Sequence, residues 1–137
     1  MNPRQAIHKI INLLEGMENA QVNNQWKWEI ASWKRTLEFL LTENAYLKTQ
    51  VAELAGQPMH TATDLEHFLS RFLQQEEVIQ LMKKELRDCE NLLHIVKTSI
   101  QKESLQLRRN KFKNDMDLLE TKFKELVQEF KKRMSAG

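Results

Sequence analysis

The sequence predicts an all-α protein whose long amphipathic helices form a helical bundle or coiled coil. Its 137 residues include only three glycines and two prolines, too few turn residues for a sheet of many strands. Leu, Lys, Glu and Gln, which are good helix formers, dominate the composition, and apolar residues recur at helical spacing. The length is that of one domain, so we expect residues 1–137 to form a single helical domain of three or four helices.

Two helices are predicted before the strongest break in the chain. Asn2 and Pro3 are suited to a helix cap and a first helical position, which predicts a helix over residues 3–20. The polar residues 21–24 offer a turn and a second cap, so the next helix is expected over residues 25–55. Gly56 and Pro58 then mark its end, since glycine can end a helix in the left-handed conformation and proline cannot continue one.

Two more helices are predicted after this break. Thr63 and Glu66 have the spacing of a capping box, which begins a helix over residues 63–100. Its apolar stripe is widened by Leu69, Val78 and Leu92, and a stripe this broad suits a bundle better than a two-stranded zipper. The stripe after Ile100 is out of phase, which favours a break and a last helix over residues 105–134; one continuous helix with a stutter is the alternative.

A heptad repeat in the 25–55 helix is the most specific pattern in the sequence. The a and d positions form a predicted interaction surface: Trp26, Ile30, Trp33, Leu37, Leu40, Asn44, Leu47, Val51 and Leu54. A single Asn among apolar a residues fixes register in parallel two-stranded coiled coils. Glu29 precedes Lys34 by five residues and Glu43 precedes Lys48 by five, the offset that joins opposite charges across a parallel pair. This pattern predicts a homodimer or another helical protein partner.

An intrachain interpretation of the same helix is about equally supported. In it, the heptad line packs against other helices of its own chain, and Asn44 hydrogen-bonds to a neighbour or to water. Trp28, Phe39 and Tyr46 form a second apolar line on the opposite side, so the helix has two faces to cover. The tryptophans 26, 28 and 33 could line a recognition groove, but packing in a core is the favoured interpretation.

The residues from His94 to Ser99 resemble the His-x-x-Lys-Gly pattern of histidine-containing phosphotransfer domains, which are also helical bundles. The resemblance implies that His94 accepts a phosphoryl group and that Lys97, one turn further on, helps to balance its charge. Thr98 stands where the family has its glycine, and only about six residues match. An exposed histidine paired loosely with Glu90 is the favoured interpretation.

A basic cluster lies in the C-terminal part of the chain. Residues 101–137 carry ten Lys and Arg against six Asp and Glu, although the net charge of the chain is only +2. Arg108, Arg109, Lys111 and Lys113 are the candidate contacts for nucleic-acid phosphates. Acidic residues interrupt this segment at helical spacings, so a solvated helix face is favoured over a nucleic-acid site.

Other classes of site find little support in the sequence. The single cysteine, Cys89, falls on an apolar stripe and is expected to be a buried thiol without a catalytic role. His8, His60, His67 and His94 lack metal-ligand spacing, no cofactor motif is present, and no apolar run is long enough for a membrane span or signal peptide. We therefore expect a cytoplasmic, non-enzymatic interaction or oligomerisation protein, with no cofactor, metal or small-molecule substrate.

Overall fold

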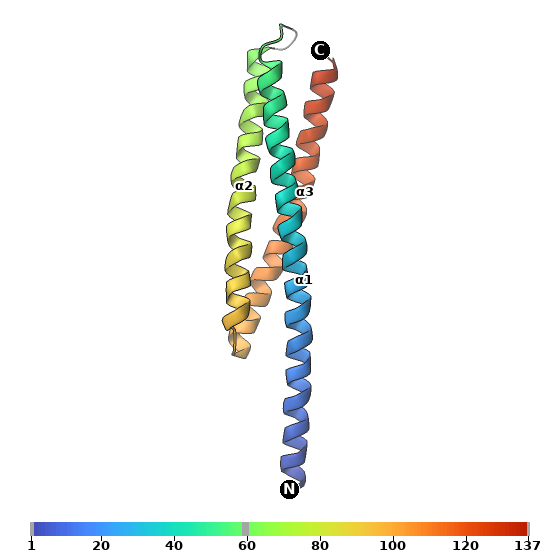
Figure 1. Cartoon of the computed structure of the whole chain (residues 1–137), viewed down its shortest axis with the longest axis vertical. Coiled ribbons are helices and arrows are strands. Elements are labelled where there is room, and N and C mark those ends of the chain that lie inside the picture. Colours follow the sequence, from blue (N-terminus) through green and yellow to red (C-terminus); the bar gives the residue numbers. More distant parts are fainter. Residues whose placement is uncertain (1, 59–60, 137) are drawn as a thin grey trace. The chain divides into compact units, whose positions relative to one another are not determined.

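The described residues of the chain form three long α-helices. The computed structural model describes residues 2–58 and 61–136, except for the side chains of 15–23 and 136. The helices are α1, Pro3–Leu54, α2, Ala62–Ile95, and α3, Ser99–Ala136 (Figure 1). The described residues contain no strand, and the predicted all-α class is confirmed.

The chain is divided into two compact units, and the boundary lies between Ser32 and Trp33. The first, Met1–Ser32, contains the N-terminal part of α1. The second, Trp33–Gly137, contains the rest of α1 together with α2 and α3, and it is called the bundle below.

The turn predicted at residues 21–24 is wrong, because α1 is helical throughout this stretch. The predicted helices over 3–20 and 25–55 are therefore one helix. The physical reason lies in the residue types: Gln, Val and Asn each cost a helix less than about 1 kcal/mol, and neither Gly nor Pro interrupts the four positions. The predicted cap at the start, in contrast, is present. Asn2 Oδ1 accepts a hydrogen bond from Gln5 N at 3.0 Å.

The break around Gly56 and Pro58 is confirmed. Helix α1 ends at Leu54, and Gln57 N donates to the Leu54 carbonyl at 3.0 Å in the turn that follows. No described glycine has a positive φ, so the turn does not use the left-handed conformation predicted for Gly56. The cap of the next helix is Thr61 rather than Thr63: its side chain accepts a hydrogen bond from Asp64 N, so the acid of the capping pair is Asp64 and not Glu66.

The predicted break between the last two helices exists, but it comes earlier than expected. Helix α2 ends at Ile95, and α3 begins at Ser99, so the alternative of one continuous helix is wrong. Thr98 Oγ1 accepts from Gln101 N at 3.1 Å, and Gln101 Oε1 accepts from Thr98 N at 3.2 Å. This reciprocal capping box satisfies backbone donors at the start of α3 and explains why the chain turns here without Gly or Pro.

Helices α1 and α2 run antiparallel within the bundle. Lys34 pairs with Glu90 near one end of the shared seam, and Lys48 pairs with Glu76 nearer the other. The residue number rises along α1 as it falls along α2. The two helices therefore lie side by side in opposite directions, as Figure 1 also shows.

Helix α3 is antiparallel to α2. Arg108 pairs with Glu85, and Arg133, near the other end of α3, pairs with Asp64 at the start of α2. Since α1 and α3 both oppose α2, the bundle is an up-down-up arrangement of three helices.

Aromatic rings from different helices pair inside the bundle, at two levels along its length. The Phe130 ring lies 5.3 Å from the Phe68 ring and 5.4 Å from the Phe72 ring, both edge-on. Trp33 joins α1 to α3 through Phe112, with ring centroids 5.1 Å apart. Such tilted and edge-to-face pairs add about 0.5–1.5 kcal/mol each to the burial of their surface.

Candidate interaction surfaces

The predicted heptad surface forms part of the core of the bundle. Among the heptad residues within the bundle, two are partly exposed, Trp33 and Leu54. The others are buried: Leu37, Leu40, Asn44, Leu47 and Val51. Trp26 and Ile30 belong to the first unit and are also buried. Most of this line is therefore not available to a partner in the folded bundle.

Asn44 is fully buried and bonds within its own chain. Its Nδ2 donates to the Phe72 carbonyl of α2 at 2.9 Å, while its Oδ1 has no hydrogen-bond partner among the described residues. Lys34 and Lys48, which the sequence assigned to a parallel partner, pair instead with Glu90 and Glu76 of α2. The intrachain interpretation of the heptad therefore describes this helix in the folded chain.

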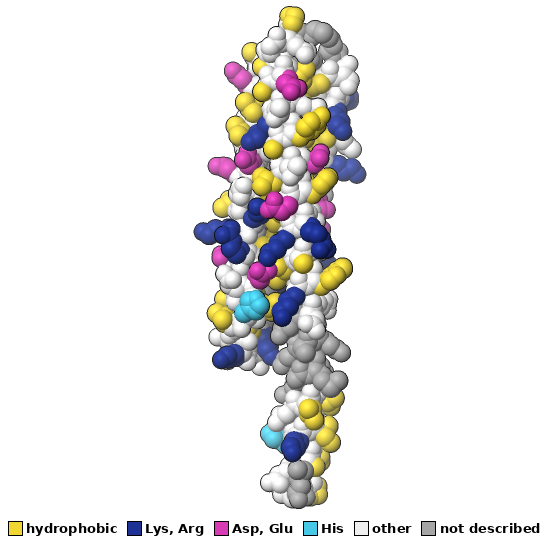
Figure 2. Space-filling view, viewed as in Figure 1, with side chains coloured by type: hydrophobic (Ala, Val, Ile, Leu, Met, Phe, Trp, Pro, Cys, Tyr) yellow, Lys and Arg dark blue, Asp and Glu magenta, His cyan; other side chains and the backbone are white. Residues whose placement is uncertain are grey.

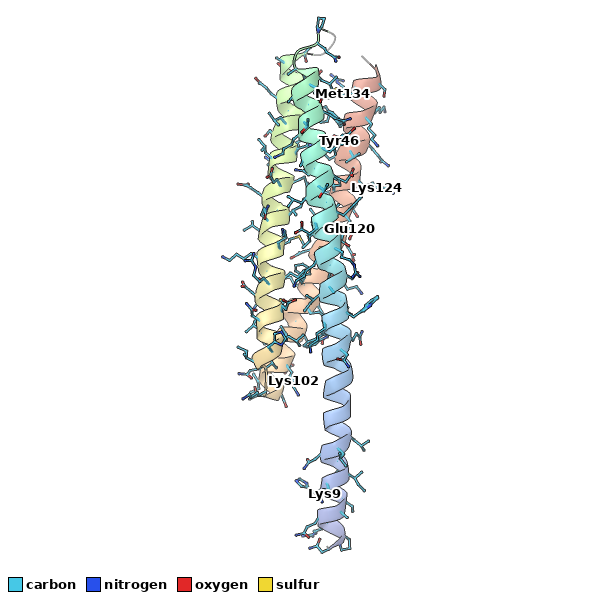
Figure 3. All side chains as sticks on the ribbon, viewed as in Figure 1. Lys9, Tyr46, Lys102, Glu120, Lys124 and Met134 are labelled. Atoms are coloured by element: carbon cyan, nitrogen blue, oxygen red, sulfur yellow. The ribbon has the colours of Figure 1, made fainter. Side chains whose placement is uncertain are left out.

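The three tryptophans differ in how far they are exposed. Trp26 is 8% exposed, Trp33 is partly buried against Phe112, and Trp28 is 70% exposed. Phe39 and Tyr46, the other members of the second apolar line, are about as exposed as Trp28, and Figure 3 shows where Tyr46 lies on α1. Core packing accounts for two of the tryptophans, and the line that contains Trp28 stays uncovered in the chain.

An exposed apolar surface lies near the start of α1. The side chains that form it are 45–66% exposed, and we call them the N-terminal arc: Ile7, Ile10, Ile11, Leu13 and Leu14. At 100° per residue they fall within roughly 160° of the helix circumference. Figure 2 shows hydrophobic side chains gathered along one side of this segment. An arc this wide and this exposed is characteristic of a helix that meets a partner.

The polar side of the same segment carries only positive charge. At 100° per residue Arg4 lies beside Ile11 at one edge of the arc, and His8 and Lys9 lie on the opposite side; Lys9 is labelled in Figure 3, and residues 2–14 contain no Asp or Glu. This surface could have been suspected from the sequence, because five apolar residues recur at helical spacing in a segment that has basic residues and no Asp or Glu. The helical spacing of these apolar residues does not reveal whether they are buried or exposed, because periodicity alone does not distinguish a buried face from an exposed one.

A second uncovered surface lies on α2 and is acidic. It comprises Glu66, Leu69, Leu73, Glu77 and Leu81, which lie within roughly 120° of the helix circumference, and we call it the acidic face. Leu73 is 48% exposed and Leu81 67% exposed, and both line a shallow groove on α2. Leu69 and Val78, which the sequence assigned to the widened stripe, are exposed too, so that stripe is narrower than predicted.

The residues of the phosphotransfer resemblance are separated by the end of a helix. His94 lies exposed in the last turn of α2, whereas Lys97 and Thr98 lie in the turn that follows. The family's pair requires a histidine and a lysine one turn apart on the same helix, and the end of α2 at Ile95 removes that relationship. Glu90, the expected partner of His94, pairs with Lys34.

The basic cluster is split by pairing with acids. Arg108 donates from Nε and Nη2 to Glu85 Oε1 at 3.0 and 2.8 Å, and this hydrogen bond raises the pKa of the guanidinium. Lys111 lies 4.0 Å from Asp115, and Arg109 donates to Asn110 Oδ1. Lys113 is exposed. With Arg108 held against α2, the four residues do not present one uniform surface to phosphates.

Cys89 is buried in α2, as the sequence predicts. Its side chain is 6% exposed, and burial is the main cause that raises the pKa of the thiol to about 11, with a smaller contribution from the nearby Glu85 carboxylate. A thiol with such a pKa is almost entirely protonated at neutral pH and is a poor nucleophile.

Further properties of the described residues bear on the class of protein. None of the helices has a stretch that is both apolar and long enough to cross a bilayer, in the part of the chain that the structure describes. The same part contains no group of three or more His, Cys, Asp or Glu side chains arranged to hold a metal ion.

No protein-family model, curated protein or solved structure matches this sequence. The fold itself defines the class, which is that of antiparallel three-helix bundles.

Proposed function

We propose that this chain is a non-enzymatic helical assembly module that self-associates and that its contact surface is the N-terminal arc. The supporting observation is the exposure of five large aliphatic side chains on one side of one helical segment, with Ile10 56% exposed and Leu13 66% exposed. Fully burying a side chain of this size from water stabilises it by roughly 1.5–3 kcal/mol, and each of these side chains, being 45–66% exposed, retains about half of that burial to gain. Leaving all five in water therefore forgoes a substantial free energy that association would recover.

The surface proposed for self-association is therefore the N-terminal arc and not the heptad line that the sequence predicts. The heptad residues Leu37, Asn44 and Val51 are at most 2% exposed, and a partner could reach them only by opening the bundle. The arc requires no such rearrangement. The rival functions gain no comparable support, because His94 and Lys97 do not share a helix and Arg108 is engaged with Glu85.

The test measures the mass of the full chain by sedimentation equilibrium over a wide concentration range. We expect the wild-type chain to associate reversibly and Ile10→Asp to raise its dissociation constant by at least about tenfold, which corresponds to 1.4 kcal/mol. Because Ile10 is exposed, the thermal unfolding midpoint of this variant should match that of the wild type at protein concentrations where both are monomeric.

Leu107→Asp is the matched control, since Leu107 is 66% exposed on α3 and lies outside the arc. It should associate as the wild type does. A wild-type chain that is monomeric at every concentration, or an equal weakening by both substitutions, would contradict the proposal.

A further inference from the structure

The N-terminal arc and the acidic face have complementary charge. The segment that carries the arc contains Arg4 and Lys9 and no acid, whereas the acidic face contains Glu66 and Glu77. The only Lys or Arg between Glu66 and Leu81 is Arg71, and its guanidinium is engaged by Glu129 of α3. Over this length α2 therefore offers carboxylates without a free competing cation.

The two surfaces also agree in apolar character and in length. Leu69, Leu73 and Leu81 are 37%, 48% and 67% exposed, and together they give the acidic face an aliphatic centre. At 1.5 Å per residue, residues 4–14 extend for about 15 Å and residues 66–81 for about 22 Å. The whole basic amphipathic segment therefore fits along the acidic face.

We infer that the occupant of the acidic face is the N-terminal arc of a second copy of this chain. This inference rests on the proposed self-association and specifies its geometry: a heterologous contact, in which residues 4–14 of one copy lie against residues 66–81 of α2 in the other. In a pair of copies that exchange their arcs, this contact forms twice and the interface as a whole is isologous, whereas a one-way contact continues into a ring or a filament.

Charge and composition favour this occupant over two others. Pairing of one arc with the arc of another copy brings positively charged segments together and leaves Leu73 and Leu81 exposed. An anionic lipid surface would attract Arg4 and Lys9, but at about 1 kcal/mol per cation two residues give weak binding, and the acidic face would have no role. The heterologous contact covers both surfaces at once.

The first experiment measures self-association of single variants of the full chain by sedimentation equilibrium. Leu81→Asp should raise the dissociation constant by at least about tenfold, as Ile10→Asp does. Should Leu81→Asp associate like the wild type while Ile10→Asp does not, this inference is wrong and the proposed self-association through the arc survives. The proposed self-association and this inference both require that Ile10→Asp weakens association. If Ile10→Asp associates like the wild type, the proposed function itself is wrong.

The second experiment exchanges the charges. Reversing the basic segment (Arg4→Glu with Lys9→Glu) or the acidic face (Glu66→Lys with Glu77→Lys) should weaken association, and the chain with all four substitutions should regain it. Restoration can only arise if the two surfaces meet each other, so a fourfold variant as weak as either double variant overturns the inference.

Two further readouts separate the occupants. A chain that stays monomeric while Ile10→Asp lowers its unfolding midpoint would show that the arc docks on its own bundle. A monomeric chain that sediments with phosphatidylserine vesicles, but not with phosphatidylcholine vesicles, and loses this binding in Ile10→Asp would identify a lipid surface. Either result overturns the second copy as the occupant.

Discussion

Asn44 of α1 donates a hydrogen bond from Nδ2 to the main-chain carbonyl of Phe72 in α2, at 2.9 Å in the core of the bundle. This hydrogen bond fixes the register of α1 against α2, because sliding one helix along the other would separate the Asn44 amide from the Phe72 carbonyl. The Asn44 side chain is fully buried, and its Oδ1 lacks a partner among the described residues, so the amide sets register at some cost in stability.

Substitutions at Asn44 test this role. Asn44→Val removes the unpartnered buried oxygen, and we expect a free energy of unfolding within about 1 kcal/mol of the wild type or above it. Asn44→Asp places a carboxylate beside the Phe72 carbonyl and should destabilise by about 3 kcal/mol or more. Urea unfolding followed by circular dichroism measures both. Equal losses in the two variants would contradict the proposed cost of the buried amide.

The contact of Trp33 with Phe112 should contribute measurably to the attachment of α1 to α3. Trp33→Ala removes a ring pair at 5.1 Å and should cost about 2 kcal/mol, less than a fully buried tryptophan because Trp33 is partly exposed. Trp28→Ala is the control: at 70% exposure it should change the free energy of unfolding by no more than about 0.5 kcal/mol. A loss in the control as large as that in Trp33→Ala would rule out this account.

The thiol of Cys89 should react slowly in the folded chain. Its pKa of about 11, against an ordinary 9.0, lowers the thiolate fraction at pH 8 by roughly a hundredfold, and burial slows access further. A disulfide reagent such as DTNB should therefore label the native chain far more slowly than the urea-unfolded chain. Comparable labelling rates would show that the thiol is accessible.

The same shift predicts a stability change in alkaline solution. Because the folded pKa lies above the unfolded one, the contribution of the protonated thiol is complete below about pH 9 and is lost as the pH rises towards about 11. Cys89→Ala lacks this titration, so its stability relative to the wild type should improve over that interval. A difference between the two proteins that stays constant with pH would contradict the raised pKa.

Asp64 should stabilise the start of α2 above the acid range. The hydrogen bond with the Thr61 side chain is the largest cause that lowers the pKa of its carboxyl, and Arg133 adds to the effect. A lowered folded pKa gives stability that is present above the ordinary value of 3.8 and is lost as the pH falls through the folded value.

Thermal unfolding at two pH values checks this sign. Asp64→Asn should lower the unfolding midpoint at pH 7, and its difference from the wild type should shrink as the pH falls through the lowered folded pKa, because the wild-type carboxyl then becomes protonated as well. A midpoint difference of equal size at both pH values would attribute the loss to packing rather than to charge.

The helical class, the break at Gly56 and Pro58 and the core of α2 followed from the sequence alone. Local chemistry decides these features: good helix formers fill the chain, proline cannot continue a helix, and apolar residues such as Phe72, Ile79 and Leu86 recur at helical spacing. The N-terminal cap of α3 could also be predicted from the sequence, since Thr98 and Gln101 have capping-box spacing. The position of the break was predicted too late in the chain because Ile100 continues the apolar stripe of the preceding helix.

Only the tertiary structure decided which helix each apolar face meets. The heptad around Asn44 is compatible with a parallel partner and with an antiparallel neighbour in the same chain. The spacing of apolar residues along a helix shows which face is packed but does not show in which direction the neighbouring helix runs. The pairing of Lys34 with Glu90 and of Lys48 with Glu76 resolved that choice. For the same reason Ile7 and Ile10 could be recognised as apolar from the sequence, whereas their exposure became evident only once the helices were placed.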